Sequence, residues 1–386
     1  MHGRPVLSPA TDQEGTFVCI EFLTVPMSTG LIVKALPPVV QNLGRMFCAA
    51  AWSRPPMLTV GAVSTTVSLR SMRQTGHTGP LLQTPTCQYR WYESWISVPA
   101  DKAAVPNGRT HGVAVDRNGN LYVFHQATPA VLVYDETGSL LHSWGDYPGA
   151  HGLTLVEEGG EEFLWLTDEH KGVVEKTTLD GRVCQTISPP EYARREKYVP
   201  TWVAVNEVRY GGNGDIWVAD GYGSGRVNRY NAAGDFIGSL DGTGGAGRFQ
   251  CPHGIWFDRR KSPMELYVAD RGNRRVQVFD GEGVYLRSFG ESFLTSPDCF
   301  AHDGDTLIIP ELLGRVTVVD ADDRLLYHLG ENGRTGKDKD PAWPNDNPLV
   351  PGLFNSPHGA AVDGSGNIFV VEWRVGGRVI KLERIR

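Results

Sequence analysis

Internal repetition constrains this chain more than any other feature of its sequence. A unit that starts with a short apolar strand is present in six copies, and neighbouring copies start roughly 40 to 60 residues apart. Each copy continues with a turn such as RNGN or GSGN, a second strand with a polar end, a glycine-bearing turn, a third strand and usually a fourth. Four short antiparallel strands make one blade of a β-propeller. The sequence therefore predicts an all-β fold, a six-bladed β-propeller.

The two ends of the repeat region complement each other. The last copy ends after its third strand, whereas the segment YRWYESWISV at 89–98, rich in β-forming residues, precedes the first copy without a partner. We expect this N-terminal segment to supply the outer strand of the last blade, which would close the ring and protect an open sheet edge. No helical period of about ten residues or more separates the strands, so a parallel α/β fold is excluded. The propeller is predicted to span residues 87–386.

Residues 1–86 differ in sequence pattern from the rest of the chain. They contain no repeat and show neither helical nor alternating periodicity. We interpret them as a poorly ordered N-terminal extension. The alternative is a start codon assigned too far upstream, since Met57 or Met72 could begin a complete chain.

Charge and cysteine content narrow the partners and the compartment. The formal net charge is −7 at pH 7, so the long-range field repels phosphate backbones and anionic headgroups, and we expect neither nucleic acid nor a membrane as a partner. No apolar run approaches the roughly 20 residues of a spanning helix. The six cysteines show no CxxC pairing or regular spacing. We expect a cytoplasmic location, with export left open as an alternative.

One position of the repeat carries four histidines. In a propeller the first strand of each blade lines the central channel, so the starts of the six copies converge on the axis. Imidazoles that converge there with a carboxylate are ligands for zinc or another divalent transition metal such as iron. The alternative is that a PHG start is only a feature of the repeat, with the histidine capping a turn. The candidate metal ligands are His111, His151, His253, Asp298 and His358.

A second set of candidates lies where the second strands end. An aspartate that ends such a strand often bonds the backbone of the following turn, which is a structural role. The residues just beyond these ends vary from copy to copy and face the same mouth of the channel, and such variety on a repeated frame indicates a site. These residues are Gln126, Glu169, His170, Tyr222, Arg271 and Trp373.

Several motifs together carry a family resemblance. The copies are similar to NHL repeats, and HGLTL with LWLTDEH, VADGYGSGRV, CPHGIWFD with LYVADRGNRRVQVFD, and SPHGAAVDGSGNIFVVEW resemble the peptidyl-α-hydroxyglycine α-amidating lyase family. The resemblance covers residues 90–386. It implies that Tyr222 of the DGY motif is the catalytic base and that Arg271 of the ADR motif belongs to the active site. The histidines that match the family's catalytic zinc ligands, from alternate blades, are His151, His253 and His358.

The chain also departs from this family's pattern. Gln126 stands where the family has an arginine, and Ser356 where it has a methionine. Gly359 replaces an aspartate that binds calcium, which argues against a calcium site, and Gly223 replaces a disulfide cysteine. The missing guanidinium puts a peptide substrate in doubt, because it would help to hold a carboxylate.

The resemblance implies a zinc-dependent C–N lyase that cleaves a carbinolamide, taken from a small molecule or a peptide, to an amide and an aldehyde or keto acid. Zinc would lower the pKa of the substrate hydroxyl, Tyr222 would accept its proton, and Gln126, His170 and Trp373 would contact the substrate. Two alternatives stay open. One is a non-catalytic NHL-repeat scaffold with a protein partner and structural histidines. The other is a metal-dependent propeller hydrolase or lactonase, which usually uses calcium with oxygen ligands.

Overall fold

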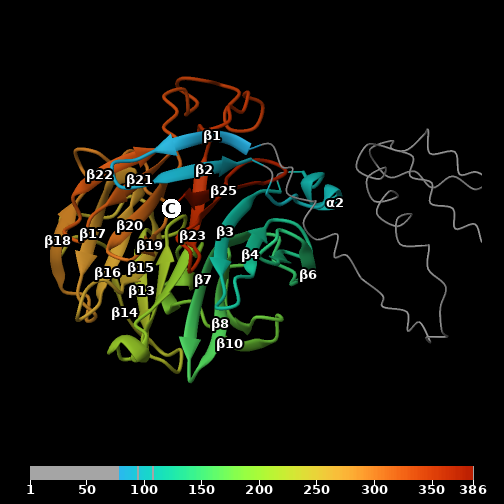
Figure 1. Cartoon of the computed structure of the whole chain (residues 1–386). Coiled ribbons are helices and arrows are strands. Elements are labelled where there is room, and N and C mark those ends of the chain that lie inside the picture. Colours follow the sequence, from blue (N-terminus) through green and yellow to red (C-terminus); the bar gives the residue numbers. More distant parts are fainter. Residues whose placement is uncertain (1–77, 94, 107, 386) are drawn as a thin grey trace, which may run out of the picture. The chain divides into compact units, whose positions relative to one another are not determined.

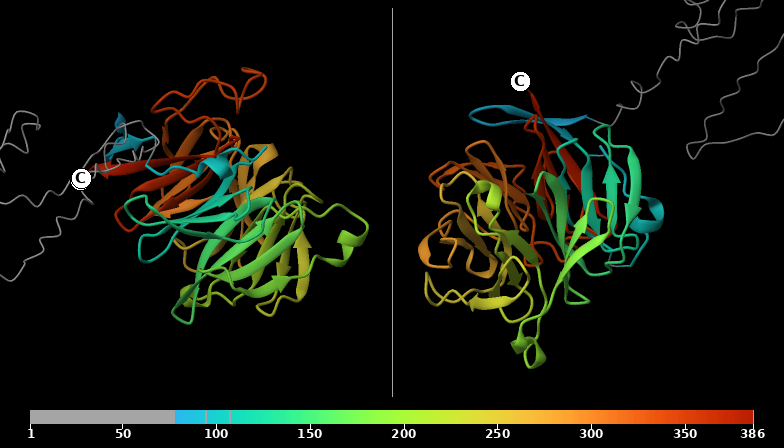
Figure 2. Two further views of the ribbon diagram at one scale, coloured as in Figure 1. Left: turned by 90° about the vertical axis from the view of Figure 1, so that its right-hand side faces the viewer. Right: turned by 90° about the horizontal axis from the view of Figure 1, so that it is seen from below.

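Six β-sheets stand around a common centre (Figure 1, Figure 2). The computed structural model describes residues 78–93, 95–106 and 108–385. Five sheets have four strands and one has five, and in the first five blades each strand pairs with its neighbour in the chain. The prediction of an all-β, six-bladed propeller is confirmed.

The strands are short, as the turn spacing predicts. In blades one to three they are β3 (Thr110–Val115), β4 (Leu121–His125), β5 (Val131–Tyr134), β6 (Leu140–Trp144), β7 (Ala150–Glu158), β8 (Glu161–Asp168), β9 (Val173–Thr178), β10 (Val183–Ile187), β11 (Trp202–Val205), β12 (Ile216–Asp220), β13 (Arg226–Tyr230) and β14 (Phe236–Leu240). In blades four to six they are β15 (Pro252–Asp258), β16 (Glu265–Asp270), β17 (Arg275–Phe279), β18 (Tyr285–Phe289), β19 (Ala301–Asp303), β20 (Thr306–Glu311), β21 (Arg315–Val319), β22 (Leu325–Leu329), β23 (Pro357–Val362), β24 (Ile368–Glu372), β25 (Arg378–Ile385), β2 (Gln88–Tyr92) and β1 (Thr78–Gln83).

Within the described residues, helical turns occur only in the connections between strands. They are α2 (Ala100–Ala103), η2 (Glu191–Arg194), η3 (Val208–Tyr210) and η4 (Arg271–Asn273). None of the helices in the described part of the chain has the length and apolar character needed to cross a bilayer.

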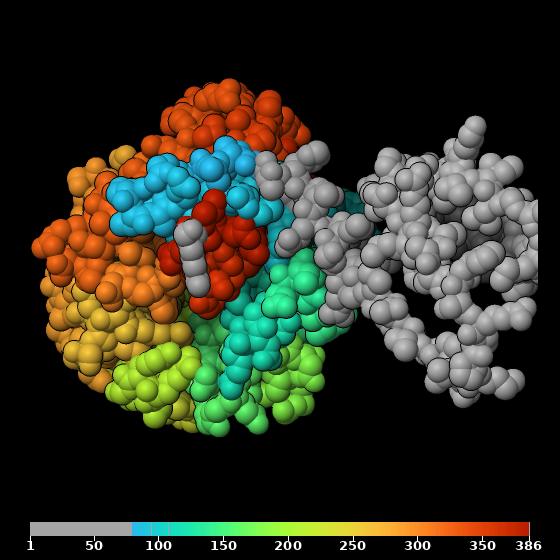
Figure 3. All heavy atoms as spheres, viewed as in Figure 1, coloured from blue at the N-terminus to red at the C-terminus, as the bar shows by residue number. Residues whose placement is uncertain are grey.

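The last blade combines strands from both ends of the described chain. Its order is β1-β2-β25-β24-β23, and β2 runs antiparallel to β25 with Trp91 opposite Leu382. Figure 3 shows this N-terminal hairpin beside the C-terminal strand. Residues 78–83, which the sequence pattern places in the N-terminal extension, form β1. Residues 1–77 of that extension, with both alternative start sites, lie outside the described residues.

The segment expected to form the outer strand is only partly a strand. Residues 89–92 pair with β25, whereas the chain beyond them turns toward the first blade. There the Ile96 side chain is buried, and the ring of Trp95 packs against that of Phe369 with centroids 5.1 Å apart. These apolar side chains therefore fill the space between the first and last blades instead of extending the sheet.

Burial depends on a strand's place in its blade. The second strands are covered on both faces by neighbouring blades, and β4 and β12 read as buried runs, LYVFH and IWVAD. The fourth strands lie at the rim, where Leu140 and Phe236 are 44% and 46% exposed. Burial thus decreases from the axis to the rim, so the innermost strands begin where the side chains are most buried.

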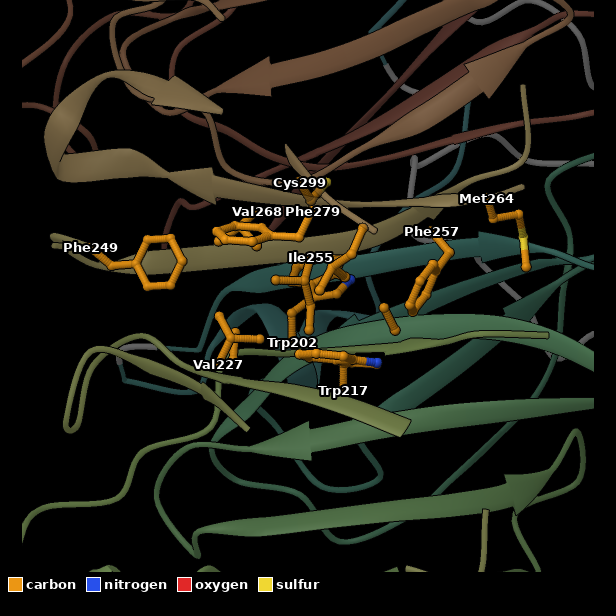
Figure 4. Packing of buried hydrophobic residues seen from close by; sticks show 13 residues of the cluster. Trp202, Trp217, Val227, Phe249, Ile255, Phe257, Met264, Val268, Phe279 and Cys299 are labelled. Carbon is orange, nitrogen blue, oxygen red and sulfur yellow. The ribbon is translucent and has the colours of Figure 1, made fainter. Parts of the chain in front are cut away.

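The core consists of apolar clusters between adjacent blades. Figure 4 shows the cluster between the third and fourth blades, where Trp217 faces the side chains of Ile255 and Phe257. Trp217 is 1% exposed. Because each cluster joins two blades, the ring fixes the relative positions of the inner strands.

Candidate functional site

Four histidines meet at the centre of the ring. His111, His151, His253 and His358 are the second residues of β3, β7, β15 and β23, and each is at most 1% exposed. Their ring centroids lie 4.6 Å apart for His111 and His358, 4.9 Å for His111 and His151, and 4.8 Å for the three pairs among the other histidines. The repeat thus brings residues far apart in sequence into one cluster.

Three of these rings are held in the same way. Nδ1 of His151 lies 2.8 Å from the carbonyl oxygen of Thr201, and Nδ1 of His253 lies 2.9 Å from that of Asp298. Nδ1 of His358 lies 3.1 Å from the carbonyl oxygen of His111. A carbonyl oxygen only accepts, so each Nδ1 donates its proton to the next blade and each Nε2 keeps its lone pair. This is the arrangement of metal-binding histidines.

Burial keeps the four imidazoles neutral. It lowers the pKa of His151 to about 3, against the hydrogen bond to Thr201, which raises it. The pKa values of His111, His253 and His358 are also well below the usual value, mainly through burial and then through repulsion between a protonated ring and the neighbouring histidines or arginines. A histidine must be neutral to bind a metal, so these rings are ready as ligands at neutral pH.

The donor set fits a divalent transition metal. Two groups have ligand atoms within 4.8 Å of one another: His111 with His151 and His358, and His253 with Asp298 and His358. Within this cluster His111 Nδ1, His358 Nε2 and Asp298 Oδ2 are buried and have no hydrogen-bond partner among the described residues. Buried polar atoms without partners call for an ion or a water, and neutral imidazole nitrogens suit zinc.

The alternate-blade set of His151, His253 and His358 is not one of those two groups. The hydroxyl of Tyr222 lies between two of its members, 3.3 Å from Nε2 of His151 and 2.9 Å from Nε2 of His253. The structure therefore places Tyr222 directly against the histidine cluster, on the turn that follows β12.

Arg271 connects Tyr222 to Asp298. Its Nη2 donates to the Tyr222 hydroxyl at 3.2 Å and its Nη1 to Oδ1 of Asp298 at 2.8 Å. Burial raises the pKa of Tyr222, and the Arg271 guanidinium works against that rise. Burial also raises the pKa of Asp298 to about 7, again opposed by Arg271. The phenol is thus neutral at neutral pH unless more positive charge is placed beside it.

The other predicted site residues contact neighbouring polar and aromatic side chains. Gln126 donates from Nε2 to Oε1 of Glu169 at 3.2 Å. His170 is largely exposed, and its Nε2 lies 3.9 Å from the same carboxylate. The guanidinium of Arg109 lies over the ring of Trp373, 4.7 Å from its centroid. Gln126 and His170 therefore share Glu169 as a partner, and Trp373 packs against Arg109.

Two further residues in these contacts carry no repeat signal. Trp343 comes from the long connection before β23, and its ring lies 6.2 Å from that of Trp373. Arg109 stands two residues before His111, and this spacing is the only sign in the sequence that it lies near the axis. Sequence reasoning missed both.

The aspartates that end the second strands are structural. Oδ1 of Asp220 accepts from the backbone N–H of Val199 at 2.6 Å, and its Oδ2 accepts from that of Ser224 at 2.9 Å. Asp168 binds the N–H groups of the turn that carries His170 in the same way. These carboxylates fix the turns on which the site residues stand.

A cavity of about 840 Å³ is lined by residues of the segment 188–198 together with Lys171 and Gly172. The next residue, Val199, donates its backbone N–H to Asp220, two positions before Tyr222. Lys171, Arg194 and Lys197 give it cationic groups, whereas Pro190 and Tyr198 give it apolar ones. A volume of this size can hold a small ligand or part of a peptide.

Fold and site together define a six-bladed β-propeller with a buried, histidine-rich centre. No protein-family model matches the chain. Its homologues are NHL repeat-containing protein 3 and peptidyl-α-hydroxyglycine α-amidating lyases. Human NHL repeat-containing protein 3 is 32% identical over 232 residues, which cover 55% of this chain and 65% of that protein. The chain thus spans slightly less than two thirds of this relative.

The amidating lyases are more distant. Peptidyl-α-hydroxyglycine α-amidating lyase 2 of Drosophila melanogaster is 24% identical over 339 residues, which cover 72% of this chain and 75% of that enzyme. Two solved structures share the fold at 14% identity: a streptogramin B lyase, with a TM-score of 0.50 over 77% of this chain and 98% of its own, and a gluconolactonase from Xanthomonas campestris, with 0.51 over 80% and 98%.

Proposed function

We propose that the chain is a metal-dependent C–N lyase that cleaves a carbinolamide, in which a hydroxyl and an amide nitrogen share one carbon. The observation that carries the proposal is the position of the Tyr222 hydroxyl, within 3.3 Å of two histidine Nε2 atoms and of Arg271. Homology to amidating lyases supports the reaction class. The substrate is a small molecule or derives from a peptide.

His151, His253 and His358 would hold the ion, since each donates from Nδ1 to a carbonyl and keeps Nε2 for a ligand. Zinc suits three neutral imidazoles, and iron is the next choice. When bound, such an ion supplies Lewis acidity toward the substrate hydroxyl. Calcium does not suit this set, because it prefers oxygen ligands.

Tyr222 is the proposed proton acceptor. Burial raises its pKa, so it accepts a proton only if positive charge stabilises the phenolate, and Arg271 at 3.2 Å is the resident source. The phenolate takes the proton of the substrate hydroxyl, and the released electron pair forms the C=O bond. The C–N bond then breaks with its electrons on nitrogen, and the new phenol returns the proton to give the amide.

Three predicted site residues, Gln126, His170 and Trp373, would recognise the substrate. The amide of Gln126 donates to Glu169 and has further hydrogen-bonding capacity for a substrate. It carries no positive charge, unlike an arginine at this position. Trp373 offers an apolar face beside Arg109, and His170 is exposed at the rim. The cavity lined by the segment 188–198 would take the part of the substrate that lies away from the reacting carbon.

The test uses a peptide that ends in α-hydroxyglycine and measures glyoxylate release by zinc-loaded protein. Wild type should release it, and Tyr222→Phe should lower kcat/KM by about 100-fold or more, the usual contribution of a general base. Tyr285→Phe, on the outer strand β18, is the matched control and should change nothing. Full activity of Tyr222→Phe would remove Tyr222 from the mechanism.

One observation favours a second candidate, a binding scaffold. The relative with 32% identity is named only for its repeats. A scaffold has no need of a metal, so absence of bound ion and of turnover together would favour it. If the protein binds metal but releases no glyoxylate, the metal-dependent reaction stays a hypothesis and this substrate is excluded.

A further inference from the structure

His111 is held differently from the other three histidines. Their Nδ1 atoms each donate to a backbone carbonyl of the neighbouring blade, whereas Nδ1 of His111 has no hydrogen-bond partner among the described residues. Its side chain is 1% exposed. A buried nitrogen without a partner carries the cost of its desolvation, which a bound ligand would offset.

The ring of His111 lies against two others. It meets the ring of His358 edge to face, with centroids 4.6 Å apart and planes at 81°, and its centroid is 4.9 Å from that of His151. Nε2 of His358 also lacks a partner among the described residues. Two partnerless nitrogens on touching rings, with a third imidazole beside them, can share one ion, and the ligand atoms of all three lie within 4.8 Å of one another.

These histidines come from both sides of the seam where the ring closes. His111 belongs to the first blade and His358 to the last, and Nδ1 of His358 donates to the carbonyl oxygen of His111. At the outer edge of the last blade, β2 pairs with β25. On the channel side, an ion bound by both histidines would add a further link between the first and last blades, beside the hydrogen bond from His358 to His111.

We propose that His111 is a further ligand of the metal, shared with His151 and His358, and that the ion fastens the first blade to the last. The inference rests on the proposed function in that both need a bound ion, but it adds a structural role that catalysis does not require. Loss of this ligand should therefore weaken metal binding and reduce the stability gained from metal, because an ion that binds only the folded state raises Tm by mass action.

The experiment uses the full-length protein stripped of metal and titrated with Co²⁺ and Zn²⁺. Visible absorption of the Co²⁺ form reports the ligand set, competition with a chelator gives the affinity, and thermal unfolding gives the rise in Tm. His111→Ala should lower the affinity by about tenfold or more, which is at least the effect of removing a group that hydrogen-bonds to a metal ligand. It should also alter the Co²⁺ spectrum and reduce the rise in Tm. His142→Ala, at an exposed histidine on β6 of the same blade, should behave as wild type.

His111→Asn, which keeps a polar side chain of similar reach, serves if the alanine variant does not fold. An unchanged affinity and spectrum in either variant, with metal bound to wild type, would overturn the role of His111 and leave the proposed lyase intact. If wild type itself binds no metal, this inference and the metal-dependent reaction both fail.

Discussion

Replacing Arg271 with glutamine should destabilise the fold strongly at pH 8 and much less at pH 5. Arg271 Nη1 donates to Oδ1 of Asp298 at 2.8 Å, and the side chains are 15% and 0% exposed. Removing one partner of a buried ion pair leaves the other charge uncompensated, which typically costs about 3–5 kcal/mol. At pH 8 the free energy of unfolding should fall by about that amount.

The pH dependence follows from the pKa of Asp298. Burial raises it to about 7, and Arg271 holds it down from a still higher value. A carboxyl whose pKa is raised in the folded state binds its proton more tightly there, so stability falls as pH rises from the unfolded to the folded pKa. Without Arg271 this loss should extend above pH 7. At pH 5 the carboxyl is neutral with or without Arg271, and only about 1–3 kcal/mol of lost hydrogen bonding should remain.

The assay is urea unfolding followed by tryptophan fluorescence at both pH values. A chelator in the buffer keeps bound metal from contributing to the free energy of unfolding. Arg226→Gln is the matched control, because its pair with Glu196 is 25% and 48% exposed and should be worth at most about 1 kcal/mol. An equal loss of stability at pH 5 and pH 8 in Arg271→Gln would refute the reasoning.

Two further predictions concern the core and the histidines. Trp217→Ala should lower the free energy of unfolding by about 3–5 kcal/mol, because Trp217 is 1% exposed in the core cluster between two blades. Leu325→Ala, on an outer strand and 39% exposed, should cost far less, and similar costs in urea unfolding would contradict this view of the core. His151→Gln should make the metal-free protein less sensitive to acid. Burial lowers the pKa of His151 to about 3, so its contribution to stability is lost as pH falls below about 6.5. Parallel acid-denaturation curves for wild type and variant would contradict the assignment.

The repeat made most of the fold predictable. Six copies with three or four strand signals each fix the number of blades and the identity of the inner strands, because the turn residues and the apolar runs recur in register. The way in which the N-terminal segment closes the ring was harder to predict from the sequence. Trp95 and Ile96 are good β-formers, yet they pack between blades, because tertiary burial outweighs strand propensity there. β1 has no repeat signal at all.

The site was predictable in position but not in contacts. Repeat register alone brings His111, His151, His253 and His358 to one height on the axis. It does not reveal that three rings donate to carbonyls while His111 does not, since ring orientation depends on the neighbouring blade. The position of Tyr222 between two histidines likewise depends on the turn after β12, which Asp220 fixes.

The central claim is that the histidine cluster binds a divalent transition metal. Elemental analysis of protein purified without added metal or chelator tests it most directly, with a variant that combines His151→Ala and His253→Ala beside it. We predict stoichiometric zinc or iron in the wild type and its loss from the variant. No metal in the wild type, or the same metal content in both proteins, would contradict the claim and favour a binding scaffold.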